Sequence, residues 1–119
     1  LAYIKERKPF GVAIGSFQAL QHRAAKMFCE IELLKSIVLK ALQAIDEGDE
    51  PLALWASMAK EKAGETIKLV TSEAIHMYDG IGMTDDEEIG FFIKRARVAQ
   101  AFLGDYNFDL DRYAHLHGY

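Results

Sequence analysis

The chain has 119 residues, of which 50% are hydrophobic and 27% charged, and its formal net charge is −4. This length suits one domain with a single core, and the composition is ordinary for a globular protein. The negative charge, with no compensating basic stripe, argues against a nucleic-acid partner. No apolar run is long enough to span a bilayer, and the lone Cys29 cannot form an intramolecular disulfide.

Residues 1–8 predict the last turns of a helix, with basic residues at its end where cations complement the helix dipole. Pro9 ends this helix because proline lacks a backbone N–H. The chain opens at Leu1 inside the helical pattern, so we expect a fragment of a longer protein.

A glycine-punctuated turn follows. Gly11 and Gly15 are expected to adopt backbone angles closed to other residues, which lets the chain reverse. The Ser16 hydroxyl is expected to cap the next helix by accepting a bond from an unpaired N–H group. The turn therefore predicts an abrupt start for a long helix.

That helix runs for about thirty residues from Phe17, because apolar residues recur every three or four positions. Gly48 suits its end, and Pro51 suits the first turn of the helix that follows. Polar residues fall off the apolar stripe and are expected to form a solvated face: Lys26, Glu30, Lys35, Lys40 and Gln43.

Three further helices are predicted from the same periodicity: one from Trp55 to Met77, one from Ile89 to Phe102, and a short one after Gly104. No strand-like alternation and no repeat is present. Long helices joined by short turns pack antiparallel, so we predict an all-α, up-and-down helical bundle that spans residues 1–119 as a single domain.

Three motifs resemble metal sites, and each has a plainer interpretation that we favour. Glu73 and His76 have the Glu-x-x-His spacing of di-iron bundles, but such sites need two copies. The segment 105–109 resembles the start of a calcium loop but lacks its glycine and closing glutamate, which favours a solvated turn. His115 and His117 lie near the end of the sequence, where fraying is expected. We therefore predict no metal site.

Two stretches resemble a known family. Tyr3-Ile4-Lys5-Glu6-Arg7-Lys8-Pro9-Phe10-Gly11 and the following Ile14-Gly15-Ser16-Phe17-Gln18 are similar to the C-terminal helical domain of acyl-CoA dehydrogenases, with its R-x-x-F-G motif, short loop and F-Q helix start. The resemblance continues through Gly80-Ile81-Gly82 and Lys94-Arg95-Ala96-Arg97, so it covers nearly the whole chain.

The resemblance implies a flavoprotein that binds FAD between two subunits and oxidises an acyl-CoA thioester to the 2,3-enoyl-CoA. A glutamate takes the α-proton, FAD takes the β-hydride, and electron-transferring flavoprotein reoxidises the flavin. By the same resemblance, Arg7 and Phe10 meet the pyrophosphate and adenine side of FAD, and Gln18 contacts the flavin. Gly80 and Gly82 form a turn that lets the backbone approach the dinucleotide. A fork of guanidinium donors suits phosphate oxygens.

The sequence departs from the family at three positions. His76 replaces a glutamine and Asp79 a glycine in the second motif, and a carboxylate there would repel a pyrophosphate unless turned away. Leu103 stands where members with the base in this domain carry glutamate, so we predict no catalytic residue in the chain. Either a helix upstream of Arg7 carries the base, or a partner subunit supplies the chemistry.

The leading hypothesis is the C-terminal FAD-binding and oligomerisation domain of a bacterial, cytoplasmic acyl-CoA dehydrogenase-like protein, inert without its N-terminal helical and middle β domains. Apolar stripes on several sides of the long helices predict a homo- or hetero-oligomer. Two alternatives stay open: a non-catalytic subunit of a heteromeric enzyme, and a helical interaction module without flavin. The acyl substrate is not predictable from this sequence.

Overall fold

All regular structure in the described part of the chain is helical. The structure, a computed structural model, describes residues 1–8, 11–48, 51–78, 88–102, 104 and 106–119. In chain order the elements are α1 (Ala2–Glu6), the short 3₁₀ turn η1 (Ile14–Ser16), α2 (Gln18–Glu47), α3 (Leu52–Met77), α4 (Glu88–Ala101) and α5 (Tyr106–His117). The predicted all-α class and the four predicted helices after the first turn are confirmed.

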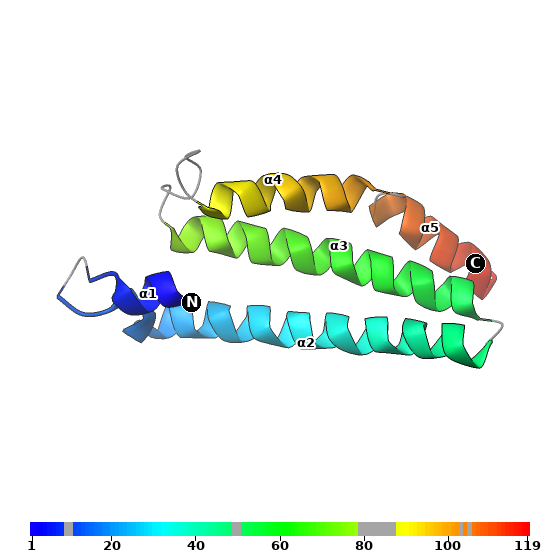
Figure 1. Cartoon of the computed structure of the whole chain (residues 1–119), viewed down its shortest axis with the longest axis horizontal. Helices are drawn as coiled ribbons and strands as arrows, with labels where there is room; N and C mark the ends of the chain where they lie inside the picture. The colour runs from blue at the N-terminus through cyan, green and yellow to red at the C-terminus, as the bar shows by residue number, and fades with distance from the viewer. Residues whose placement is uncertain (9–10, 49–50, 79–87, 103, 105) are drawn as a thin grey trace.

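The helices form an elongated array with α3 in the middle (Figure 1). The long helices α2 and α3 run antiparallel side by side, and α4 and α5 pack end to end along the other side of α3. The molecule measures 56 × 26 × 26 Å and its radius of gyration is 17.4 Å. A compact domain of this length would have a radius of gyration of about 13.5 Å. The layers are therefore open rather than closed around one core.

The turn between α2 and α3 follows the prediction. Gly48 adopts the left-handed conformation with φ 67°, and its N–H donates to carbonyls in the last turn of α2. This geometry ends a helix at little cost only where no Cβ is present. Pro51 stands directly before α3, where its missing N–H is harmless.

Glycines in the turn before α2 serve two different purposes. Gly11 has a φ of 81°, as predicted. Gly15 does not adopt such an angle. Instead, a Cβ on Gly15 would lie 2.9 Å from the carbonyl oxygen of Ile4. The expectation of an unusual backbone angle is wrong for Gly15, because close packing of α1 on η1 is what requires the missing side chain.

The predicted Ser16 cap is also wrong. The Ser16 hydroxyl donates to the carbonyl of Ala13 at 2.7 Å and is used within the 3₁₀ turn. Helix α2 begins one residue later than this capping scheme requires, with Phe17 as the residue before its first turn and no side-chain cap.

Few apolar side chains are fully covered. Among the described residues, only Ile4, Ala44 and Met77 are buried apolar residues. The accessible surface is 8453 Å², whereas a folded monomer of this mass is expected to expose about 6,500 Å². The exposed large apolar side chains lie mainly on α2 and α4, including Phe28, Leu39, Leu42, Ile45, Phe91, Phe92, Val98 and Phe102.

Polar contacts attach the last turn of α4 to α3. The Lys60 ammonium donates to the carbonyls of Ala99 at 2.9 Å and Gln100 at 3.3 Å. In return, the Gln100 amide donates to the carbonyl of Gly64 at 3.0 Å. The Lys60 ammonium therefore satisfies carbonyls at the end of α4 that lack partners within the helix, and its charge complements the dipole of α4.

None of the helices in the described ranges combines the length and the apolar character that crossing a membrane requires.

Candidate functional site

Two of the five predicted FAD-contacting residues lie in the described part of the chain. Arg7 directly follows α1, and Gln18 is the first residue of α2. The ends of these two elements meet at one end of the molecule, which also holds the end of α3 (Figure 1). Several predicted positions lie outside the described residues: Phe10, Gly80 and Gly82, together with Asp79 and Leu103.

Backbone hydrogen bonds connect Arg7 to the start of α2. The Ile14 N–H donates to the carbonyl of Arg7 at 2.9 Å, and the Phe17 N–H donates to the carbonyl of Ile14 at 3.1 Å. Phe17 directly precedes Gln18. These two bonds therefore link the residue that follows α1 to the residue that precedes Gln18.

The side chain of Arg7 is held by an aromatic cluster. Its guanidinium donates a hydrogen bond to the Tyr3 hydroxyl, and its Cζ lies 5.4 Å from the centre of the Tyr3 ring. The Tyr3 ring in turn stacks on Tyr78, with 4.1 Å between centroids and 10° between planes. Sequence reasoning missed both tyrosines. Only the four-residue spacing of Tyr3 and Arg7 could have indicated a contact.

The electrostatics of this end suit an anionic group. The first turn of α2 contains no acidic residue and has no side-chain cap, so its backbone N–H groups present a partial positive charge. Arg7 adds a full positive charge that is half-buried, and Lys8 adds another that is exposed. The helix start and the two basic residues therefore make the described residues here positively charged.

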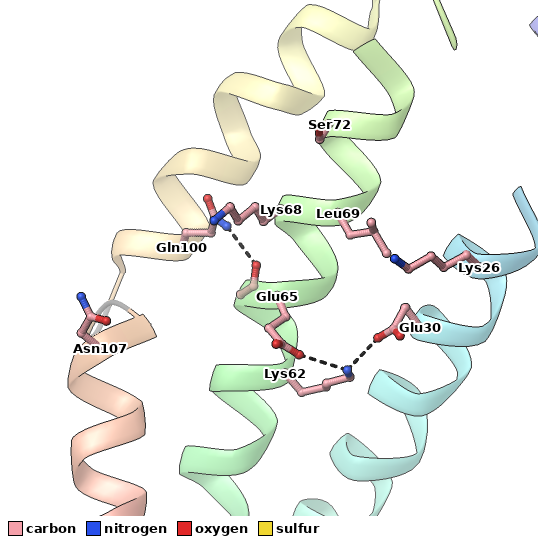
Figure 2. A pocket seen from close by; sticks show the side chains of 10 residues that line it. Lys26, Glu30, Lys62, Glu65, Lys68, Leu69, Ser72, Gln100 and Asn107 are labelled. Carbon is pink, nitrogen blue, oxygen red and sulfur yellow. Dashed lines mark hydrogen bonds and ion pairs between the residues drawn. The ribbon is translucent and has the colours of Figure 1, made fainter. Parts of the chain in front are cut away.

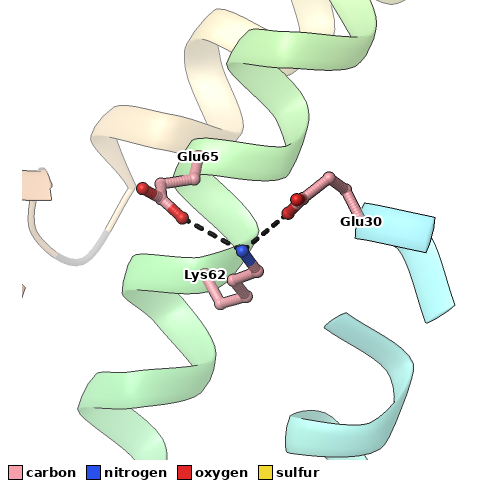
Figure 3. Close-up of polar contacts among 3 residues, drawn as sticks. All are labelled: Glu30, Lys62 and Glu65. Atoms are coloured by element: carbon pink, nitrogen blue, oxygen red, sulfur yellow. Dashed lines mark hydrogen bonds and ion pairs between the residues drawn. The ribbon is translucent and has the colours of Figure 1, made fainter. Parts of the chain in front are cut away.

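A second polar region lies across the middle of the array, in a groove of about 830 Å³. The Lys62 ammonium lies 2.6 Å from a Glu30 carboxylate oxygen and 3.1 Å from one of Glu65 (Figure 3). The bond to Glu30 is the main cause that raises the pKa of Lys62. In Figure 2, Lys26 extends from α2 toward Leu69, whereas Lys68 extends from α3 toward Gln100, away from α2. Among the charged residues of the groove, Lys62, Glu30 and Glu65 pair with one another.

Contacts between α2 and α3 correct the prediction that Glu30 and Lys40 lie on a solvated face of α2. Glu30 is half-buried against Lys62, and the Lys40 ammonium lies 5.4 Å from the centre of the Trp55 ring. Both residues face α3 because the contact stripe of α2 is wider than its apolar residues alone indicate.

The residues that resembled metal ligands have other surroundings. A Glu73 oxygen lies 3.3 Å from the Arg23 guanidinium, and His76 is exposed. Asp109 is buried in the first turn of α5, so the solvated turn expected there is wrong for this residue. His115 and His117 are exposed in the last turn of α5, which ends at His117. The part of the chain that the structure describes contains no group of three His, Cys, Asp or Glu residues that could hold a metal.

Comparison with known proteins places this helical array in the flavin-dependent dehydrogenase class. Residues 1–115 match the family described as acyl-CoA dehydrogenase, C-terminal domain. The chain therefore belongs to the acyl-CoA dehydrogenase family and corresponds to the C-terminal domain of its flavoproteins.

Curated relatives agree with this assignment. The chain is 33% identical over 114 residues to the mitochondrial short/branched chain specific acyl-CoA dehydrogenase of Bos taurus, covering 96% of this chain and 26% of the relative. It is 35% identical over 104 residues to acyl-CoA dehydrogenase IpdE2 of Mycolicibacterium smegmatis, covering 87% and 32%. The chain thus spans about a quarter to a third of the length of these relatives.

Solved structures share the same fold. A steroid acyl-CoA dehydrogenase variant superposes with a TM-score of 0.91 at 32% identity, over 98% of this chain and 32% of the other. Butyryl-CoA dehydrogenase from Megasphaera elsdenii superposes with a TM-score of 0.90 at 27% identity, over 98% and 30%. The open helical array is therefore similar to one domain of these longer proteins.

Proposed function

We propose that this chain supplies part of an FAD site and a subunit contact in a flavoprotein that oxidises an acyl-CoA thioester to the 2,3-enoyl-CoA. One observation carries the proposal: the half-buried Arg7 guanidinium lies at the end of the molecule where α2 begins with an uncapped, acid-free first turn. The names of the relatives, which include short/branched chain and butyryl-CoA dehydrogenases, support the substrate class.

In this proposal, Arg7 holds the pyrophosphate of FAD by paired hydrogen bonds, and Gln18 contacts the flavin. Phe10 lies against the adenine side, and Gly80 and Gly82 let the backbone approach the dinucleotide. FAD, when bound, accepts a hydride from the acyl chain. The chain's own contribution is to bind and orient the dinucleotide.

The proton acceptor is proposed to come from outside residues 1–119. Leu103 occupies the position at which some relatives carry the glutamate, and a leucine side chain cannot accept a proton. We therefore propose that the chain acts together with an N-terminal helical domain and a middle β domain. Electron-transferring flavoprotein would reoxidise the flavin in a bacterial cytoplasm.

A second candidate is a non-catalytic subunit of a heteromeric acyl-CoA dehydrogenase. It is favoured by Leu103 and by the similarity to a steroid acyl-CoA dehydrogenase whose name, Tcur3481-Tcur3483, pairs two gene products. Assaying the full-length protein alone and with the product of its genomic neighbour separates the two candidates. Activity without the neighbour would exclude the non-catalytic role.

The direct test is the affinity of the full-length protein for FAD, measured by flavin fluorescence on titration of the apoprotein. Arg7→Ala should weaken binding about tenfold or more, since a lost charge-assisted contact of this kind amounts to about 1.4 kcal/mol or more. Arg112→Ala, which alters an exposed arginine in α5, should bind like the wild type. If the protein purifies colourless and Arg7→Ala and Arg112→Ala have the same FAD affinity, the proposed FAD site is excluded. The alternative of a helical interaction module without flavin would then remain.

A further inference from the structure

We propose that Tyr78 is a positioning residue for the dinucleotide site, because its stack on Tyr3 holds the Arg7 guanidinium at the end of α3. The inference rests on the proposed function. It assigns a role to two tyrosines that lie 75 positions apart in the sequence and meet only in the folded protein.

The first step concerns α1 and Arg7, the residue that directly follows it. Tyr3 and Arg7 are four residues apart and therefore lie on the same side of the helix. The guanidinium donates to the Tyr3 hydroxyl and lies 5.4 Å from the ring centre. Tyr3 therefore helps to hold the guanidinium in place.

The second step concerns what holds Tyr3. Helix α1 has five residues and is too short to be stable by itself. The Tyr3 ring stacks nearly parallel on Tyr78, with 4.1 Å between centroids. Tyr78 directly follows the 26 residues of α3, and its N–H donates to the carbonyl of Ala74 at 3.0 Å. The stack therefore ties a marginal helix to the central helix of the array.

The third step is the consequence for binding. An arginine side chain has many rotamers, and fixing one of them when a ligand binds costs conformational entropy. Tyr78 removes much of this freedom before the ligand arrives.

The test is a set of tyrosine variants in the full-length protein, read by FAD affinity and by hydrogen exchange of residues 3–7 in the apoprotein. Tyr78→Leu should weaken FAD binding by roughly threefold to tenfold and speed exchange in α1. Tyr78→Phe keeps the ring and should resemble the wild type. Tyr3→Phe keeps the stack but loses the hydroxyl contact to Arg7, so it should weaken FAD binding while exchange stays slow. Tyr113→Leu, at the other end of the array, is the matched control.

A double-mutant cycle separates positioning from general stability. If Tyr78 acts through Arg7, the Arg7→Ala, Tyr78→Leu double variant should bind FAD no more weakly than Arg7→Ala alone. Two results would overturn the inference and leave the proposed function standing. In the first, the double variant binds FAD more weakly than Arg7→Ala by the same factor as Tyr78→Leu alone. In the second, Tyr78→Leu and Tyr3→Phe bind FAD like the wild type while Arg7→Ala binds it weakly. Unchanged affinity in Arg7→Ala would overturn the proposed function, and the inference with it.

Discussion

Gly15 and Gly64 differ in what a methyl group would meet. At Gly15 a Cβ would lie 2.9 Å from the backbone oxygen of Ile4, whereas at Gly64, inside α3, it would meet nothing within 4 Å. We expect Gly15→Ala to lower the free energy of unfolding by about 1–3 kcal/mol, because backbone must shift to admit the methyl group. Gly64→Ala should raise it by about 0.5–1 kcal/mol, the usual gain in a helix interior. Urea unfolding measures both changes.

Gly64→Ala is the control for Gly15→Ala, because both variants add one methyl group to the same chain. Equal effects at the two positions would contradict the close approach of α1 to η1. Gly15→Ala should also speed hydrogen exchange in residues 2–6, whereas Gly64→Ala should not.

At the residue scale, conformations that depend on neighbours in sequence could be predicted, whereas contacts between distant residues could not. Gly11 could be predicted because a turn needs a positive φ locally. The requirement at Gly15 comes from the backbone of Ile4, which is a tertiary contact, and the Tyr3–Tyr78 stack joins segments that share no periodicity. Local rules identify residues that act on their own neighbours in sequence, and they do not identify which distant residue completes a contact.

At the scale of the helices, Lys62 joins α2 to α3. Its ammonium bonds Glu30 across the helix pair and Glu65 within α3, and the Lys62 and Glu30 side chains are only 24% and 26% exposed. Glu30→Gln should therefore lower the free energy of unfolding by about 1–2 kcal/mol. This loss lies between those expected from breaking an exposed ion pair and from breaking a buried one. Glu65→Gln, which removes an exposed contact within one helix, should cost only about 0.2–0.5 kcal/mol.

The pH dependence of the same pair has a definite sign. Glu30 raises the pKa of Lys62 above its ordinary value of 10.5 in the folded protein. The stabilisation is therefore fully present below pH 10.5 and is lost as the pH rises through the raised pKa. The difference in unfolding free energy between the wild type and Glu30→Gln should be constant near neutral pH and shrink above pH 10.5. A difference that grows in this range would contradict the assignment.

The helix boundaries were predictable because periodicity and breakers act locally. The run of apolar residues from Phe17 and the Gly48 breaker place α2 within a residue or two, whereas α3 begins at Leu52, three residues before the predicted Trp55. Which side of α2 faces α3 was harder to predict. Glu30 and Lys40 face α3, but because they are polar, the pattern of apolar residues does not identify them as contact positions. The candidate site was predicted through family resemblance at Arg7 and Gln18, since charge and spacing alone do not define a dinucleotide site.

At the scale of the whole molecule, the accessible surface predicts association. The chain exposes 8453 Å², roughly 2,000 Å² more than a compact monomer of its mass. Phe28, Leu39 and Leu42 are 63%, 62% and 51% exposed and recur on one side of α2. We expect the protein to sediment as a dimer or larger oligomer at micromolar concentration, and Leu39→Glu with Leu42→Glu to shift it toward monomer by burying charge at the contact.

Gln43→Glu adds a charge to an exposed position next to Leu42 and serves as the control for this prediction. It should leave the oligomer intact. A wild-type protein that sediments as a monomer at high concentration, or a control that dissociates as readily as the double variant, would show that this side of α2 is not a subunit contact.

The central position of α3 has a consequence for how the sequence can change over time. Helix α2 on one side and α4 with α5 on the other make their main contacts with α3 and not with each other. Substitutions on the two outer layers should therefore combine additively, since well-separated sites without shared partners rarely influence one another. A lineage could remodel one outer layer for a new neighbour while the other kept its own, with α3 as the slowly changing partner common to both.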